Sequence, residues 1–497
     1  MAVIGVVLAV VGTAGFLVRP PAHRIRVVGG NLPVDAGATN PLDLTASNSP
    51  SLVANPTDPA NLVVVNRIDT PNPGCGLHAS HDGGATWTSV VLPGVAGKQV
   101  GCFSPDAAFG PDGRLYVSFT SIDKVAGLGV LPDAAWVATS TDGGRSLGPP
   151  VRITGPGAFE TRLAADPATP GRLLLTWLQA TQTSTWGLVD AGNPIVVSRS
   201  DDSGATWGHP VVVSSPYRAL VAAPSITFDH HGNPHIAYLD LGDDLLDYTG
   251  AHQGMGGPPY PKTWTLLVSN EDGGTTGWSE SVVDTGVVPT ERILMSDPPR
   301  PSVVAGPGAI LYVAFADGRS GDPDVRLWAS HDLGRRWGPP RRVNDTPLRD
   351  GTDQYLPALG VAPDGRLDVI YYDRRSDPKD IRNDVSLQSS YDGGRTFTKH
   401  VQLSDRSFDA SIGLDANRGL PQIGDRLGVI STNRASLVVW TDTRAGDRLS
   451  GKQNLSRALV AFPGPSSSRV LWLLGAGLLV LAGAAALARS ARSRRRR

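Results

Sequence analysis

The chain has 497 residues, of which 58 are Gly and 41 are Pro, with 6% aromatic side chains and a formal net charge of −1. This length is enough to bury a large core, whereas the near-zero charge gives no electrostatic footprint for nucleic acid. Frequent Gly and Pro between short apolar runs favour an all-β repeat protein over a helical one.

Both ends of the chain are apolar. Residues 1–21 predict a signal peptide or an uncleaved signal anchor. Residues 470–488, which follow a short linker at 463–469, are long enough to cross a bilayer as a transmembrane helix. The Arg-rich tail at 489–497 is expected to stay on the cytoplasmic side. We therefore expect a protein held in the cell membrane by its C-terminal helix, with residues 22–462 on the extracytoplasmic side.

The region between these ends contains seven strand pairs, each made of two short apolar runs around a turn. The pairs lie at residues 51–66, 105–119, 162–177, 224–238, 301–315, 357–371 and 426–440. A further strand is expected within residues 23–29, before the first pair. The two cysteines, Cys75 and Cys102, can form one disulfide if the chain is exported, and two buried free thiols are the alternative.

Six of the seven pairs are followed by a copy of the turn first seen at residues 80–87 (SHDGGATW). We refer to these copies as the repeat turns. Asp-Gly-Gly between apolar runs is a hairpin signal, because Gly adopts positive φ without a steric penalty. The Asp and Ser side chains can accept hydrogen bonds from the turn's own N–H groups, so we assign the central aspartates a structural role. They are Asp82, Asp142, Asp202, Asp272, Asp332 and Asp392, about 60 residues apart.

A strand pair and the hairpin around a repeat turn together make a four-stranded blade, and a fixed period of such units predicts a β-propeller. The last pair is followed by a single strand-like run at 454–462, so the N-terminal strand can complete that blade and close the ring. We predict seven blades. Six blades, with one strand pair as an embellishment, are the alternative.

The repeat turns resemble the Asp box, or BNR repeat, of the sialidase family and related β-propellers, and the resemblance extends over residues 22–462. It implies a cell-surface glycoside hydrolase that acts on terminal sugars of glycans or glycoconjugates. The alternative is a non-catalytic propeller that binds a glycan or a surface protein, since a fold does not define a function.

The resemblance also implies a catalytic site. Sialidases hold the substrate carboxylate with arginines and use a Tyr activated by a Glu as nucleophile, with an Asp as acid/base. The segment 315–340 looks like the first sialidase blade, whereas no motif identifies the nucleophile pair. The residues that would take these roles are Arg300 as clamp, Asp322 or Asp324 as acid/base, and Glu160 with Tyr371 or Tyr372 as the nucleophile pair.

Three strands end in an Asp-x-Arg triplet, and these triplets are candidates for substrate binding together with Asp353. The alternative is a set of loop-fixing ion pairs repeated from blade to blade. No zinc-type Cys/His spacing and no phosphate-binding Gly loop is present, so neither a metal nor another cofactor is expected. The triplets are Asp317-Gly318-Arg319, Asp373-Arg374-Arg375 and Asp442-Thr443-Arg444.

Overall fold

The computed structural model describes residues 25–35, 42–90, 92, 101–125, 129–180, 192–244, 246, 260–271, 277–290, 292, 298–413 and 423–462. The predicted signal segment, C-terminal helix and Arg-rich tail lie outside these ranges. Among the described residues, no helix is long and apolar enough to span a bilayer. Residues 27–460 form one compact unit, and this unit contains the seven blades.

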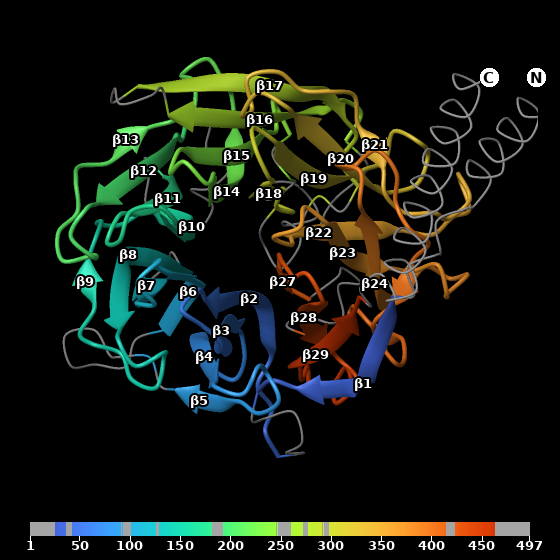
Figure 1. Ribbon diagram of the computed structural model, residues 1–497, viewed down its shortest axis with the longest axis horizontal. Coiled ribbons are helices and arrows are strands. Elements are labelled where there is room, and N and C mark those ends of the chain that lie inside the picture. Colours follow the sequence, from blue (N-terminus) through green and yellow to red (C-terminus); the bar gives the residue numbers. More distant parts are fainter. Residues whose placement is uncertain are drawn as a thin grey trace, which may run out of the picture. The chain divides into compact units, whose positions relative to one another are not determined.

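Each blade is an antiparallel sheet of four strands, and the innermost strands lie around the centre of a ring (Figure 1). Blade 1 contains, from the inside outward, β2 (Ser47–Asn55), β3 (Asp58–Ile68), β4 (Gly74–Ser80) and β5 (Thr88–Val90). Blade 2 contains β6 (Gly101–Phe109), β7 (Leu115–Val125), β8 (Gly129–Ser140) and β9 (Val151–Arg152). Blade 3 contains β10 (Ala158–Ala165), β11 (Leu173–Gln179), β12 (Ile195–Ser200) and β13 (Val211–Val212).

The next three blades repeat this plan. Blade 4 contains β14 (Val221–Phe228), β15 (Pro234–Asp240), β16 (Trp264–Glu271) and β17 (Trp278–Val287). Blade 5 contains β18 (Ser302–Ala305), β19 (Leu311–Asp317), β20 (Asp324–Ser330) and β21 (Arg341–Arg342). Blade 6 contains β22 (Gln354–Val361), β23 (Leu367–Asp373), β24 (Arg382–Ser390) and β25 (Val401–Gln402), with β26 (Phe408–Asp409) paired to β24.

The seventh blade joins the two ends of the repeat region. It contains β27 (Gly428–Ser431), β28 (Ala435–Asp442), β29 (Asn454–Ala461) and, as its outer strand, β1 (Arg26–Pro33). Figure 1 shows β1 beside β29, and the Val34 N–H donates to the Leu455 carbonyl at 2.9 Å. The prediction of seven blades closed by the N-terminal strand is confirmed, and such closure protects the sheet edges.

The apolar core lies between neighbouring blades. Between blades 5 and 6, for example, Tyr312 and Leu327 pack with Leu367 and Tyr371. Large aromatic side chains such as Trp177 and Trp440 are fully buried, and truncating such a side chain to Ala typically costs about 3–5 kcal/mol. This packing fixes each blade against the next and holds the connecting loops in place.

The repeat turns connect the third and fourth strands, and their hydrogen bonds explain the residue types. In the first turn, Ser80 Oγ accepts from the Gly84 N–H at 2.8 Å, and the Asp82 carboxylate accepts from the Thr86 N–H at 2.9 Å. The bonds from Thr86 lower the pKa of Asp82 to about 2. The turns around Asp142, Asp202, Asp332 and Asp392 repeat this pattern; Asp272 lies outside the described residues.

Candidate functional site

Three arginines and one aspartate meet at the starts of the inner strands of blades 3, 5 and 7. Arg162 and Arg300 each donate to Asp425 Oδ2 at 2.8 Å, and Arg426 lies 3.9 Å from Oδ1. Arg162, Arg300 and Asp425 are only 5–6% exposed. We refer to these four residues as the axial cluster. Its ion pairs link three blades across the ring.

The local backbone explains how these side chains reach the centre. At the start of six of the inner strands, one residue has positive φ, with values between 47° and 81°. In five blades the strand register shifts at this point, as in a β-bulge that bends the strand and redirects its side chains. The residues with positive φ are Ser49, Ser104, Glu160, Ala223, Leu356 and Gly424.

Hydrogen bonds between neighbouring blades hold these bulges in place. The Asp425 N–H donates to Ser49 Oγ at 3.1 Å, and the Ala223 N–H donates to Glu160 Oε2 at 2.6 Å. A non-Gly residue in the left-handed region costs on the order of 1–3 kcal/mol. The bonds from blade to blade offset that cost, so the positions of the axial side chains are fixed by the fold.

Burial and the neighbouring charges act in opposite directions on Asp425. Burial favours the protonated acid, but Arg300, Arg162 and Arg426 outweigh it and hold the pKa of Asp425 well below its usual range. Burial, reinforced by the charges of Arg300 and Arg426, lowers the pKa of Arg162 to about 9. The cluster is therefore charged at neutral pH, and an internal carboxylate occupies the space between two guanidinium groups.

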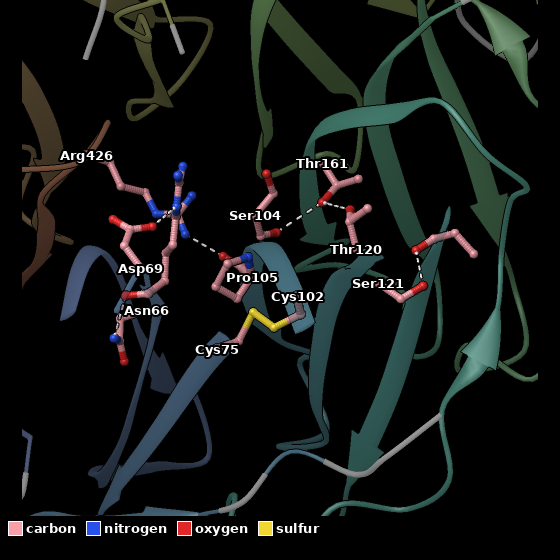
Figure 2. The surroundings of a disulfide bond; sticks show 12 residues. Asn66, Asp69, Cys75, Cys102, Ser104, Pro105, Thr120, Ser121, Thr161 and Arg426 are labelled. Atoms are coloured by element: carbon pink, nitrogen blue, oxygen red, sulfur yellow. Dashed lines mark hydrogen bonds and ion pairs between the residues drawn. A yellow bond between two sulfur atoms is a disulfide. The ribbon is translucent and has the colours of Figure 1, made fainter. Parts of the chain in front are cut away.

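Arg426 also connects the axial cluster to blade 2. Its guanidinium donates to the Pro105 carbonyl, as drawn in Figure 2, which also shows the disulfide between Cys75 and Cys102. This disulfide links β4 with β6, with 5.8 Å between the Cα atoms. On the blade 3 side of Figure 2, Thr161 Oγ1 donates to the Ser104 carbonyl at 3.0 Å.

The residues predicted as the nucleophile pair lie in different blades, Glu160 in blade 3 and Tyr371 and Tyr372 in blade 6. Glu160 lies at the start of an inner strand, as Arg300 does, and is 2% exposed. The Tyr371 hydroxyl instead donates to Gln388 at 2.6 Å and accepts from Arg375 at 3.1 Å, while the Tyr372 hydroxyl accepts from the Thr441 N–H at 3.2 Å. Burial raises the pKa of both phenols, so both stay protonated.

The two acid/base candidates hold a connecting loop. Asp322 accepts from the Gly351 N–H at 3.1 Å. Asp324 is 2% exposed and accepts from Asn344 at 2.8 Å and from Arg342 at 2.5 Å. Both carboxylates thus fix the chain between β21 and β22.

The arginines of the Asp-x-Arg triplets pair with their own aspartate and with a carboxylate of the preceding blade. Arg375 contacts Asp373 and Asp345, both at 2.6 Å. The equivalent partners are Asp317 and Asp284 for Arg319, and Asp442 and Asp405 for Arg444. In blade 6, Arg374 pairs with Asp353 at 3.1 Å. These contacts match the alternative of ion pairs repeated from blade to blade.

A tyrosine–glutamate pair occurs in blade 4, where the sequence analysis did not place it. The Tyr238 hydroxyl donates to Glu280 at 2.5 Å, and Arg218 donates to the same carboxylate at 2.8 Å. Burial and the charge of Glu280 raise the pKa of Tyr238, so this phenol is a poor nucleophile. Within the described ranges, no group of three or more His, Cys, Asp or Glu side chains could hold a metal ion.

The chain matches no protein-family model and no curated protein, but it is similar to solved structures. A protein of unknown function from Dyadobacter fermentans is 13% identical with a TM-score of 0.50, over 88% of this chain and 99% of that one. A PL25 ulvan lyase is 13% identical with a TM-score of 0.49, over 85% of this chain and 96% of that one. The Hadza microbial sialidase Hz136 is 13% identical with a TM-score of 0.41, over 81% of this chain and 74% of that one. At this identity the similarity shows the β-propeller fold alone.

Proposed function

We propose that the protein is a non-catalytic β-propeller that binds glycans at the cell surface. The observation that supports this most strongly is the place of Asp425. It lies between Arg162 and Arg300, at 2.8 Å from each, where a hydrolase of the type that the repeat turns resemble would need to hold a substrate carboxylate. The tyrosine hydroxyls are likewise bonded within the protein. Glycan as the ligand class rests on the resemblance of the repeat turns to the Asp box.

A glycoside hydrolase is the second candidate, and one observation favours it. Three arginines converge on one point, and Glu160 lies two residues before one of them, Arg162. Such an enzyme would require Asp425 to leave the arginines before a substrate carboxylate could bind. That exchange would expose buried cations, and a buried charge without its partner is costly.

The location is proposed from the sequence alone. Residues 470–488 and the Arg-rich tail support a C-terminal anchor with the propeller on the extracytoplasmic side. Protease treatment of intact cells is expected to remove the propeller. A propeller that stays protected from the protease would show that the proposed orientation in the membrane is wrong.

Catalysis and binding are tested on one preparation, the full-length chain in a mild detergent. It is incubated with fluorogenic sialosides and a panel of aryl glycosides, and the same preparation is applied to a glycan array. We expect binding to at least one glycan class and no release of fluorophore. Release that disappears in Arg300→Ala or Glu160→Gln would establish the hydrolase instead, and an array without any bound glycan would overturn the proposal.

A further inference from the structure

A second arginine-rich region lies between the outer strands of blades 5 and 6. A groove of about 830 Å³ is bounded there by β21, the loop that follows it, and the repeat turn of blade 6. This volume is within the range of roughly 300–1,000 Å³ found for ligand sites. We refer to it as the basic groove. Its cationic lining residues are Arg341, Arg342, Arg375, Arg395 and Lys399, with His400 beside them.

The groove has more positive than negative charge. Its five Arg and Lys side chains face two carboxylates, Asp345 and Asp350. Arg375 and Asp345 neutralise each other at 2.6 Å, and although burial opposes it, this pair lowers the pKa of Asp345. The remaining excess of positive charge comes from exposed side chains.

Three of these exposed cations are open to a ligand. Arg341, Arg395 and Lys399 are all exposed. In the part of the chain that the structure describes, Arg341 and Lys399 have no ion-pair partner, and the Arg395 guanidinium donates only to the Asp392 carbonyl, at 3.3 Å. Unlike the axial arginines, these cations can bind an external anion without losing an internal carboxylate.

The floor of the groove is polar and rigid. Gln388 accepts from the Tyr371 hydroxyl at 2.6 Å and donates to the Thr398 carbonyl at 2.7 Å. Beside it, Phe397 is half-buried against the core and closes the repeat turn where four of the other five turns have Trp. An amide floor, an aromatic edge and a cationic rim match a sugar ring, which carries both hydroxyl groups and apolar C–H faces.

The loop that forms one wall is held in a fixed shape. It spans residues 343–353, whereas the equivalent connection between β9 and β10 spans only 153–157. Asn344 donates to Asp324 at 2.8 Å, and Thr346 donates to Gln354 at 3.0 Å. A groove that exists before the ligand arrives avoids the cost of ordering its wall on binding.

We propose that the basic groove binds a chain of acidic sugars, a polysaccharide with uronate or sulfate groups. Guanidinium groups bind carboxylate and sulfate oxygens in a bidentate manner, and three exposed cations along one groove suit a repeated negative charge. This inference rests on the proposed glycan-binding function and assigns it a ligand class and a place. Sulfate-bearing and uronate-bearing chains share the relevant chemistry and are separated by experiment.

The test compares two triple variants of the full-length chain in detergent. One carries Arg341→Gln, Arg395→Gln and Lys399→Gln. The control carries Arg145→Gln, Arg335→Gln and Arg336→Gln, three exposed arginines in other repeat turns, of which Arg145 donates to its Asp142 carbonyl as Arg395 does to Asp392. Binding of polygalacturonate, dextran sulfate, neutral dextran and polyglutamate is measured by titration calorimetry at low and at physiological salt.

We expect polygalacturonate, dextran sulfate or both to bind, neutral dextran not to bind, and affinity to fall as salt screens the charges. The groove variant should lose roughly threefold to 150-fold in affinity, because three exposed charge contacts are removed together, and the control variant should keep wild-type affinity. Acidic-sugar binding that survives in the groove variant, or polyglutamate that binds as tightly, would overturn this inference and leave glycan binding intact. Binding of neutral glycans alone would also overturn it, whereas no binding to any glycan would overturn the proposed function itself.

Discussion

The axial cluster and the basic groove both gather arginines, but they differ in what those arginines contact. In the axial cluster, Arg162 and Arg300 are 5% exposed and share the Asp425 carboxylate. In the groove, Arg341 and Arg395 are exposed and neither forms an ion pair with a described residue. The first arrangement links blades of the protein to one another. The second leaves charge available to a ligand.

The comparison shows that several arginines lying close together do not by themselves define a ligand site. An arginine whose donors are already taken by an internal carboxylate must lose that partner before it can bind another, and the loss is largest where water is excluded. The number of donors still open is therefore a better guide than the number of arginines. The variants below test whether the axial cluster stabilises the folded protein and whether the basic groove is open to a ligand.

The largest effect is expected for Asp425→Asn, which leaves three arginines around a neutral side chain. Removing one partner of a buried ion pair costs about 3–5 kcal/mol, so the free energy of unfolding should fall by that amount in urea titrations. Asp201→Asn is the matched control, because Asp201 pairs with Arg199 at 2.7 Å on the surface. The control should lose less than about 1 kcal/mol, and equal losses in the two variants would remove the distinction between the regions.

Arg375→Gln should have an intermediate effect, because Arg375 belongs both to the groove wall and to an ion pair between blades. Its loss deprives Asp373, which is fully buried, of a partner at 2.6 Å. A hydrogen bond to a charged group contributes roughly 1.5–3 kcal/mol, and Asp345 would then place an uncompensated negative charge in the groove. Both unfolding free energy and affinity for acidic sugars should fall, and a change in neither would contradict the assigned contacts.

Acid should destabilise the propeller partly through Asp425. The pKa of Asp425 is held well below its usual range in the folded state, whereas an unfolded Asp titrates near about 3.9. As pH falls through this value, the unfolded chain takes up a proton that the folded chain does not, so stability that is complete above about pH 5 is lost toward about pH 2. Asp425→Asn should show a shallower decline between those values, and parallel pH profiles would contradict the charged state of the cluster.

The smallest effect is expected for Asp82→Ala in the first repeat turn. The Asp82 carboxylate accepts from the Thr86 N–H and hydroxyl at 2.9 and 2.6 Å, and its loss should cost on the order of 1 kcal/mol, as for other side-chain caps of backbone N–H groups. The thermal midpoint should fall with glycan affinity unchanged. A loss of binding at unchanged stability would give this turn a role in recognition.

The fold could be predicted from the sequence because the repeat is local. Each strand pair and each repeat turn shows its own pattern of apolar runs, Gly and Asp within about 60 residues, and the unpaired strand at each end indicated closure. The bounds of the N-terminal strand differ from the prediction: a strand was expected within residues 23–29, whereas β1 begins at Arg26 and extends to Pro33.

The axial cluster could be predicted only in part, because its contacts join distant segments. Arg300 and Glu160 were expected at the site, whereas Arg162 was not assigned, and its partner Asp425 is 263 residues away. A signal was nevertheless present in the repeats. Five of the seven inner strands begin with a proline after the bulge position, and blades 3 and 7 have Thr161 and Asp425 there, each followed by an arginine. The basic groove gave no such signal, since it exists only where blades 5 and 6 lie side by side.

The measurement that tests the central claim most directly is arginine-specific modification with phenylglyoxal, read by mass spectrometry on the full-length protein with and without an acidic oligosaccharide. We predict that Arg341 and Arg395 react rapidly and are protected by the oligosaccharide, while Arg162 and Arg300 stay unmodified in both samples. Rapid modification of Arg162 and Arg300 that the oligosaccharide prevents would show that the ligand binds at the axis, and would contradict the account.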